Sequence, residues 1–424
     1  MGERMSDATT SEQNTRAGFG LQRMLGRDPG QRGRVATPLE LLFDLTFVVA
    51  FGQAGNLLAH LLAEGHTTAA IGGFAYAICA IVFAWINFTW FASAFDTDDW
   101  AFRVTTMVQM VGVLVLALGL PAMFHSIDVG HGLDNGVMVA GYVIMRIAMI
   151  VQWLRAAKHD PRYRKASLAN AVFITVAQIG WVALIFADPT VTVILICSML
   201  LFALEFGGPL IIQHREGGTP WHAHHIAERY GLLAIIALGE GLIGTIASVS
   251  AVLETQGWTL EAVLLALAGT GLTFALWWAY FVAPSGEVLH HHRERGLLWG
   301  YGHIAIFASI AAVGAGLHVA AYVVEGEATI GPVGALLATA IPVAVFLIGD
   351  FLLHSYLIRQ FDPFYIWLLL GSCVALALAV YSAALGVSIG WSLLLVVLAP
   401  VIVIVGYEVG GHQRLANSLD RALG

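Results

Sequence analysis

The sequence has 424 residues, of which 58% are hydrophobic and only 11% are charged. Soluble domains carry about twice that charged fraction, so the composition excludes a soluble globular protein. The length of the apolar runs also excludes the short alternating strands of a membrane β-barrel. The net charge of −8 says little about partners, because the charges lie on two faces separated by lipid. The three cysteines stand singly within apolar runs, so neither a disulfide framework nor a thiolate metal site is indicated.

Apolar segments long enough to cross a bilayer, about 20 residues each, fill the chain almost end to end. We therefore predict an all-α, polytopic membrane protein with about twelve transmembrane helices. Residues 1–36 are rich in Ser, Thr, Gly and Arg and have no apolar core, so we expect a disordered cytoplasmic arm and not a signal peptide. In chain order, the predicted helices cover residues 39–63, 68–95, 103–124, 135–157, 167–187, 190–213, 229–253, 258–283, 297–320, 332–357, 364–387 and 389–409.

Basic residues occur in every second connection between the predicted helices. The arm, the even-numbered connections and the tail hold all 20 Lys and Arg residues except Arg146. The odd-numbered connections hold acidic residues and no Lys or Arg. The positive-inside rule places the basic side in the cytoplasm. We therefore predict a multi-pass protein of the bacterial inner membrane with both termini in the cytoplasm.

Two consecutive spans near the start resemble two spans in the second half. The segment 48–53 (VVAFGQ) matches 235–240 (IIALGE) in pattern. One span later, 87–91 (NFTWF) matches 277–281 (WWAYF) at a nearly equal offset. This agreement predicts two duplicated six-helix halves in parallel orientation, although chance similarity between apolar segments is the alternative. The predicted halves and the short cytoplasmic tail cover residues 37–215, 216–412 and 413–424.

Ionisable side chains inside membrane helices cost about 2.5–3.5 kcal/mol each to insert at the helix centre, so they normally face the bundle interior. Arg146 is the basic residue that lies inside a predicted span. We expect it to pair with an inward carboxylate, either Asp44, Glu205 or Asp350. Structural ion pairing between helices is the alternative to a functional role. The candidates for proton coupling or substrate contact are Glu240, Gln53, Arg146, Glu205 and Asp350.

Glu240 is the deepest acid, and glycines flank it at positions 239 and 241. Burial favours the protonated form of a carboxylate, so Glu240 could take up and release protons at physiological pH. The proposed duplication places Gln53 at the equivalent point of the first half. The glycines have a second explanation, because small residues let membrane helices pack closely.

A group of polar residues lies at the cytoplasmic boundary. Glu40 and Asp44 are four residues apart and therefore share a helix face. Asp99 precedes a predicted helix, where a carboxylate interacts favourably with the helix dipole. The predicted cytoplasmic-side network consists of Glu40, Asp44, Asp96, Asp98, Asp99, Arg103, Glu228, Arg229 and His303.

Two histidine clusters, at 222–225 and 290–292, lie on the predicted cytoplasmic side. His225 and Glu228 are three residues apart, a usable spacing for metal ligands on a helix. However, no HExxH motif or Cys/His zinc spacing is present, and solvated loop residues are the alternative. We therefore predict no cofactor, and the weak candidates for metal binding are His225, Glu228, His222 and His224.

Four motifs resemble those of the bacterial low temperature requirement A family. They are PLELLFDLTFV at 38–48, FDTDD at 95–99, HIAERYGLLAIIALGE at 225–240, and WWAYF at 277–281 together with YGH at 301–303. Family members often carry an acid directly after the aromatic group, where this chain has Val282. The resemblance implies a multi-pass membrane protein linked by name to growth in the cold. It implies no established activity, substrate or catalytic residue.

The leading hypothesis is a secondary transporter, with or without proton coupling, for a small polar or ionic solute. Duplicated halves and polar groups near the midplane are typical of that class. The alternatives are a membrane-embedded, metal-assisted enzyme acting on a lipid or isoprenoid, and a channel or sensor for cold adaptation. We favour a protein without catalytic residues. Its expected partners are the lipid bilayer and an unidentified small molecule or ion, with no nucleic acid.

Overall fold

The computed structural model describes residues 20–130, 132–187, 191–414 and 416. These residues form helices and no strand, and 12 of the helices are long and apolar enough to cross a membrane. The predicted all-α, multi-pass architecture is therefore confirmed. The twelve spanning helices are α2 (Pro38–Ala63), α3 (Thr67–Phe95), α4 (Trp100–Val129), α5 (Gly136–His159), α6 (Arg164–Ala187), α7 (Val191–Glu216), α8 (Ala223–Gln256), α9 (Leu260–Phe281), α11 (Gly296–Glu325), α12 (Pro332–Ile358), α13 (Pro363–Ala384) and α14 (Ile389–Gly406).

Short helical segments supplement the spans. The helix α10 (Ser285–His291) runs between α9 and α11. The segments η1 (Pro161–Tyr163) and η2 (Arg293–Arg295) are 3₁₀ turns that precede α6 and α11. The π-helical turn η3 (Tyr407–Gly411) continues α14.

Two helices begin earlier than predicted because polar side chains cap them. The Asp99 carboxylate accepts a hydrogen bond from the Phe102 N–H at 2.9 Å, so α4 begins at Trp100. The His222 Nδ1 atom accepts from the His225 N–H at 3.2 Å, so α8 begins at Ala223 and not at residue 229. In α8, the early start brings His225 and Glu228 into the helix.

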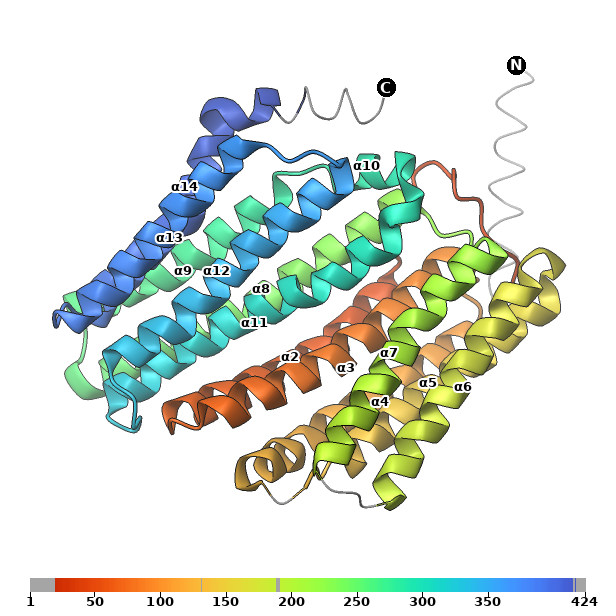
Figure 1. The fold of residues 1–424 in the computed structure, drawn as a ribbon, viewed down its shortest axis with the longest axis horizontal. Helices are drawn as coiled ribbons and strands as arrows, with labels where there is room; N and C mark the ends of the chain where they lie inside the picture. The colour runs from red at the N-terminus through yellow and green to blue at the C-terminus, as the bar shows by residue number, and fades with distance from the viewer. Residues whose placement is uncertain (1–19, 131, 188–190, 415, 417–424) are drawn as a thin grey trace.

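The helices form two groups that meet at the centre of the molecule (Figure 1). The helices α4 to α7 lie on one side, and α9 and α12 to α14 lie on the other. At the centre, α2 packs against α8 and α11, and α3 packs against α11 and α8. Equivalent pairs pack together in the two predicted halves, for example α4 with α5 and α11 with α12. The duplication itself stays a prediction.

Glycines set the distance between α8 and α11. A Cβ atom on Gly244 would lie 2.3 Å from the Gly314 carbonyl oxygen, and a Cβ atom on Gly314 would lie 2.5 Å from the carbonyl carbon of Glu240. Neither position has room for a side chain. Close backbone approach through small residues is the usual basis of packing between membrane helices, and it fixes Glu240 against α11.

Residues 20–36 lie across the ends of the helices. Met24 is fully buried, and its N–H donates to the His159 ring at 3.0 Å. The Gly26 N–H donates to Asp160 at 2.9 Å. The predicted disorder of residues 1–36 is therefore wrong for residues 20–36, because helix-end side chains satisfy the backbone there. Residues 1–19 lie outside the described part of the chain.

Candidate functional site

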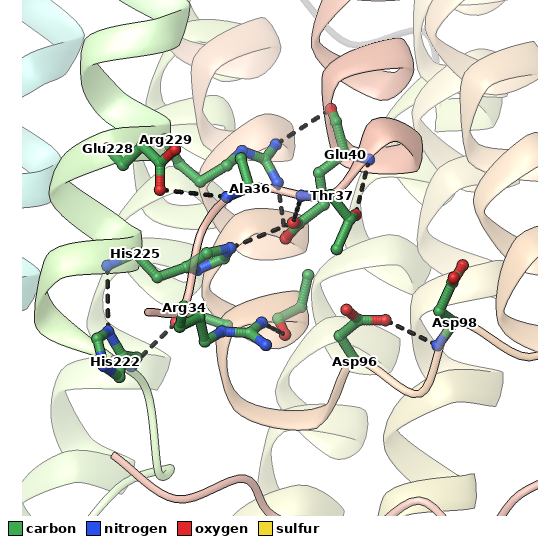
Figure 2. A network of polar contacts seen from close by, with 12 residues as sticks. Arg34, Ala36, Thr37, Glu40, Asp96, Asp98, His222, His225, Glu228 and Arg229 are labelled. Atoms are coloured by element: carbon green, nitrogen blue, oxygen red, sulfur yellow. Dashed lines mark hydrogen bonds and ion pairs between the residues drawn. The ribbon is translucent and has the colours of Figure 1, made fainter. Parts of the chain in front are cut away.

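Three of the sequence motifs meet at one end of the bundle (Figure 2). The first turns of α2 carry Glu40 and Asp44, and the start of α8 carries His225 and Arg229. The connection between α3 and α4 brings Asp96 close to them. We call Glu40, Asp44, His225 and Arg229 the boundary cluster.

The boundary cluster is built around Arg229. Its Nη1 atom lies 2.9 Å from Glu40 Oε1, and its Nη2 atom donates to Asp44. The Trp85 Nε1–H also donates to Asp44, at 2.6 Å. The side chains of Arg229, Glu40 and Asp44 are 0% exposed. A buried guanidinium between two carboxylates is stable only while all three remain in place, since removing one partner leaves an uncompensated charge.

Glu40 links the beginning of α2 to the beginning of α8. Its Oε2 atom lies 3.2 Å from His225 Nε2 and accepts a hydrogen bond from the Thr37 N–H at 2.8 Å. The Thr37 hydroxyl accepts from the Glu40 N–H at 3.3 Å, which completes a capping box. One carboxylate therefore caps its own helix and binds two side chains of α8.

The segment at residues 20–36 covers the boundary cluster. The Ala36 N–H donates to Glu228 at 3.1 Å, and the buried Arg34 donates to the Ala92 carbonyl at 3.1 Å. The His222 Nε2 atom lies 2.9 Å from the Gln31 carbonyl. Since His222 Nδ1 accepts from a backbone N–H, its Nε2 atom carries the hydrogen and donates.

The three aspartates of the α3–α4 connection have different surroundings. Burial and the nearby Glu40 carboxylate raise the pKa of Asp96 to about 6. Burial also acts on Asp99, but hydrogen bonds from Arg155 and two backbone N–H groups outweigh it and lower the pKa of Asp99 to about 2. Asp98 and Arg103 pair at 2.9 Å, and each side chain is 49% exposed. The predicted cytoplasmic-side network is therefore divided into a buried part and an exposed pair.

The four candidate metal ligands have different partners. His225 binds Glu40, and Glu228 accepts from the Ala36 N–H. His222 caps α8, and the His224 ring stacks on His290 with centroids 5.7 Å apart. Within the described residues, no group of three or more His, Cys, Asp or Glu side chains could hold a metal ion.

A second buried cluster joins α5, α6 and α7. Arg146 Nη2 lies 3.2 Å from Glu205 Oε2, and the Tyr142 hydroxyl contacts both side chains. Gln178 and Trp181 donate to the other carboxylate oxygen of Glu205 at 3.1 and 3.2 Å. The predicted pairing of Arg146 with an inward carboxylate is confirmed, and Glu205 is the partner. Asp44 pairs with Arg229 instead.

Glu240 lies in the middle of α8 and is 7% exposed. Its Oε1 atom is 3.1 Å from the position that a Cβ atom on Gly52 of α2 would take. No hydrogen bond or ion pair joins the Glu240 carboxylate to any described residue. Gln53 follows Gly52 on α2 and is half-buried. The helices that carry Gln53 and Glu240 therefore meet at this depth, as the sequence predicts.

The two remaining candidates lie apart from these clusters. The His303 ring atoms lie 2.9 Å from the Trp299 carbonyl and 3.1 Å from the Tyr280 hydroxyl. Asp350 lines a cavity of about 50 Å³ with His354 and Tyr365. This cavity is at the same end of the bundle as the boundary cluster, between α9, α12, α13 and α14.

A larger cavity of about 290 Å³ lies between α3, α5, α6, α7 and the start of α11. Glu240 and Gln53 line neither this cavity nor the smaller one. Asn87, Asn170 and Arg293 line the larger cavity, and none of them was among the site residues predicted from the sequence. Asn87 begins the repeated segment 87–91, but that repeat does not indicate a cavity. Asn170 and Arg293 have no sequence signal beyond polarity near the ends of apolar spans, which many boundary residues share.

The geometry suits different roles for these groups. The boundary cluster is a closed set of ion pairs that holds α2 against α8. Arg146 and Glu205 form a similar closed pair, with a cavity beside them. Glu240 is a buried acid with no partner among the described residues, and such groups within membrane helices are candidates for proton transfer.

Comparison with known proteins agrees with the motifs. The family model described as "Bacterial low temperature requirement A protein (LtrA)" matches residues 35–400. An uncharacterized protein of Rhizobium meliloti (strain 1021) is 27% identical over 288 residues, which is 64% of this chain. The match spans 66% of the length of that relative, just under two thirds. No solved structure matches the chain.

Proposed function

This chain belongs to the bacterial low temperature requirement A family and is a multi-pass membrane protein. We propose that it is a proton-coupled secondary transporter of a small polar or ionic solute. The observation that carries the proposal is Glu240, a buried carboxylate at the contact of α2, α8 and α11 that has no partner among the described residues. Transporters built from repeated halves place their substrate and ion sites at such central contacts.

The surroundings of Glu240 explain how a proton would be coupled to movement. An isolated charge is costly in an apolar, closely packed contact, so this arrangement favours the neutral acid. Releasing the proton requires water to reach the carboxylate, and the contact with Gly52 must then widen. Protonation would therefore stabilise the closed contact between α2 and α8, and deprotonation would favour the open one.

The boundary cluster supplies a pivot for this movement. Arg229 and His225 hold Glu40 at one end of the α2–α8 pair, so separation of the two helices is restricted there. Glu240 lies about 11 residues further along α8, or about 16 Å at the rise of a helix. A pivot at one end lets α2 and α8 open near Glu240 while the pair stays joined.

The proposal is tested with purified protein in liposomes that enclose a pH-sensitive dye. Small organic anions, organic cations, sugars and inorganic ions are added outside in turn. A transporter of this kind acidifies or alkalinises the lumen when its solute is added, and protein-free liposomes do not. Solute movement without any proton flux would contradict the proposed proton coupling. A conductance that does not saturate with solute concentration would indicate a channel instead.

A further inference from the structure

The cavity of about 290 Å³ has the size of a small-molecule site, close to the roughly 300 Å³ at which such pockets begin. Its outer rim includes Gly217 and Glu294, which are exposed. Trp90, Trp153, Trp221 and Tyr301 supply aromatic surfaces to it. Glu240 does not line this cavity.

Arg293 gives the cavity a positive charge. Its Nη2 atom donates to the Trp221 carbonyl at 2.5 Å, and its guanidinium carbon lies 4.2 Å from the centre of the Trp221 ring. Arg293 is half-buried and pairs with no carboxylate among the described residues. The carboxylate of Glu294 at the rim lies 3.4 Å from the guanidinium of Arg295, which balances its negative charge. The remaining donors of Arg293 are therefore suited to an anion.

The deep end of the cavity offers hydrogen-bond acceptors. The Asn87 and Asn170 side-chain N–H groups donate to the carbonyls of Phe83 and Ala166 at 2.9 Å. Neither carboxamide oxygen has a partner among the described residues, so each can accept from a ligand hydroxyl or amine. A ligand that fills the cavity would meet a cation near the rim, aromatic walls, and acceptors at the bottom.

The same asparagines connect the cavity to the Arg146–Glu205 pair. A smaller hollow of about 10 Å³ shares Asn87, Asn170 and Pro209 with the cavity and is also lined by Arg146 and Glu205. Pro209 lies inside α7 and has no N–H, so the Glu205 carbonyl loses its usual helical donor. The helix is weakened at the point where the cavity ends.

We propose that this cavity binds a small organic anion that carries a flat apolar body and a hydrogen-bond donor at its far end, as in a hydroxylated aromatic carboxylate. The carboxylate would bind Arg293, the ring would lie among the tryptophans, and the donor would reach Asn87 and Asn170. The inference rests on the proposed function in one respect, since it identifies this ligand as the class of solute transported.

The first test measures ligand binding to the purified protein in a neutral detergent. Tryptophan fluorescence and the melting temperature of the protein report the binding. The probe is 4-hydroxybenzoate, compared with the cation tyramine and the neutral 4-hydroxybenzyl alcohol. We expect saturable binding of 4-hydroxybenzoate and at least about tenfold weaker binding of the other two. Equal or tighter binding of tyramine would overturn the proposal. So would binding of short-chain phosphatidic acid without binding of 4-hydroxybenzoate, which would indicate a lipid site.

Variants locate the ligand within the cavity. Arg293→Gln should weaken 4-hydroxybenzoate binding at least about tenfold, and Arg293→Lys should retain the preference for the anion. Arg215→Gln removes a charge from the exposed end of α7 outside the cavity and should have no effect. Asn87→Leu should reduce the affinity for 4-hydroxybenzoate to that for benzoate, which lacks the hydroxyl, and leave benzoate unchanged. Unchanged binding in both Arg293→Gln and Asn87→Leu would place the ligand elsewhere.

The same probe separates this inference from the proposed function. In liposomes, 4-hydroxybenzoate should cause proton flux that Arg293→Gln reduces. Binding that depends on Arg293 without flux would support the anion site and contradict the transporter. Proton-coupled uptake of another solute, with no binding of 4-hydroxybenzoate, would support the transporter and contradict the anion site.

Discussion

The Glu240 carboxylate and Gly52 are in contact across the interface between α2 and α8, with 3.1 Å between Oε1 and the position of a Cβ atom on the glycine. The two residues are far apart in the sequence and belong to different predicted halves. Any side chain at position 52 would push against the carboxylate. Under the proposed function, this packing would link the protonation of Glu240 to the distance between the two helices.

Gly314 should be intolerant of even one additional carbon atom. Gly314→Ala places a Cβ atom 2.5 Å from the Glu240 carbonyl carbon, so α8 and α11 must separate, at a cost of about 1–3 kcal/mol. Melting in detergent measures this loss. The control is Gly72→Ala on α3, where no atom lies within 4 Å of the new Cβ. Equal melting of the two variants would show that the α8–α11 contact is looser than described.

Arg146→Leu should destabilise the protein by about 3–5 kcal/mol, because it leaves the buried Glu205 carboxylate without its cation. Adding Glu205→Leu should recover part of the loss. Yield and melting temperature are the measurements, and Arg215→Leu, which replaces an exposed residue at the end of α7, is the control. Wild-type yield and melting in the Arg146→Leu single variant would contradict the ion pair.

Asp96 should make stability depend on pH between about 4 and 6. Burial and the Glu40 carboxylate raise its pKa from 3.8 to about 6 in the folded protein, so the folded state binds a proton that the unfolded state has released. Stability should therefore increase as the pH falls through this window, by at most about 3 kcal/mol.

Asp96→Asn should lack this increase, whereas the exposed neighbour variant Asp98→Asn should retain it. The measurement is the melting temperature of each protein from about pH 4 to about pH 7. Parallel curves for the wild type and Asp96→Asn would mean that Asp96 titrates normally in the folded protein.

The orientation in the membrane should follow the positive charges. In a cysteine-free background, Gly130→Cys and Gly326→Cys should react with an impermeant thiol reagent added to intact cells. Arg162→Cys should react only after the membrane is opened, and reporters at both termini should report the cytoplasm. Labelling of Arg162→Cys in intact cells would contradict the predicted topology.

The helices could be predicted from the sequence because length and hydropathy are local properties. The early starts of α4 and α8 depend on capping by Asp99 and His222, which single apolar runs do not indicate. The packing of residues 20–36 could not be predicted from composition. It depends on contacts such as that of Gly26 with Asp160, more than 100 residues away.

The candidate site could be predicted in part. A buried arginine needs a carboxylate, so a partner for Arg146 was expected, but the sequence does not say which helices are neighbours. Asp44 therefore remained an alternative until the structure placed it on Arg229. The cavity with Asn87 and Arg293 is assembled from five helices, the turn η2 and the connection between α7 and α8, and no local sequence pattern predicts such an assembly.

In the proposed mechanism, Glu240 couples a proton to solute movement. The most direct measurement is proton flux on addition of a transported solute, in liposomes containing wild type, Glu240→Gln, or the control Glu254→Gln, which changes an exposed acid on the same helix. We expect Glu240→Gln to keep its fold and still exchange solute but to lose proton-driven accumulation, while Glu254→Gln behaves as wild type. Wild-type accumulation and proton flux in a well-folded Glu240→Gln protein would contradict it.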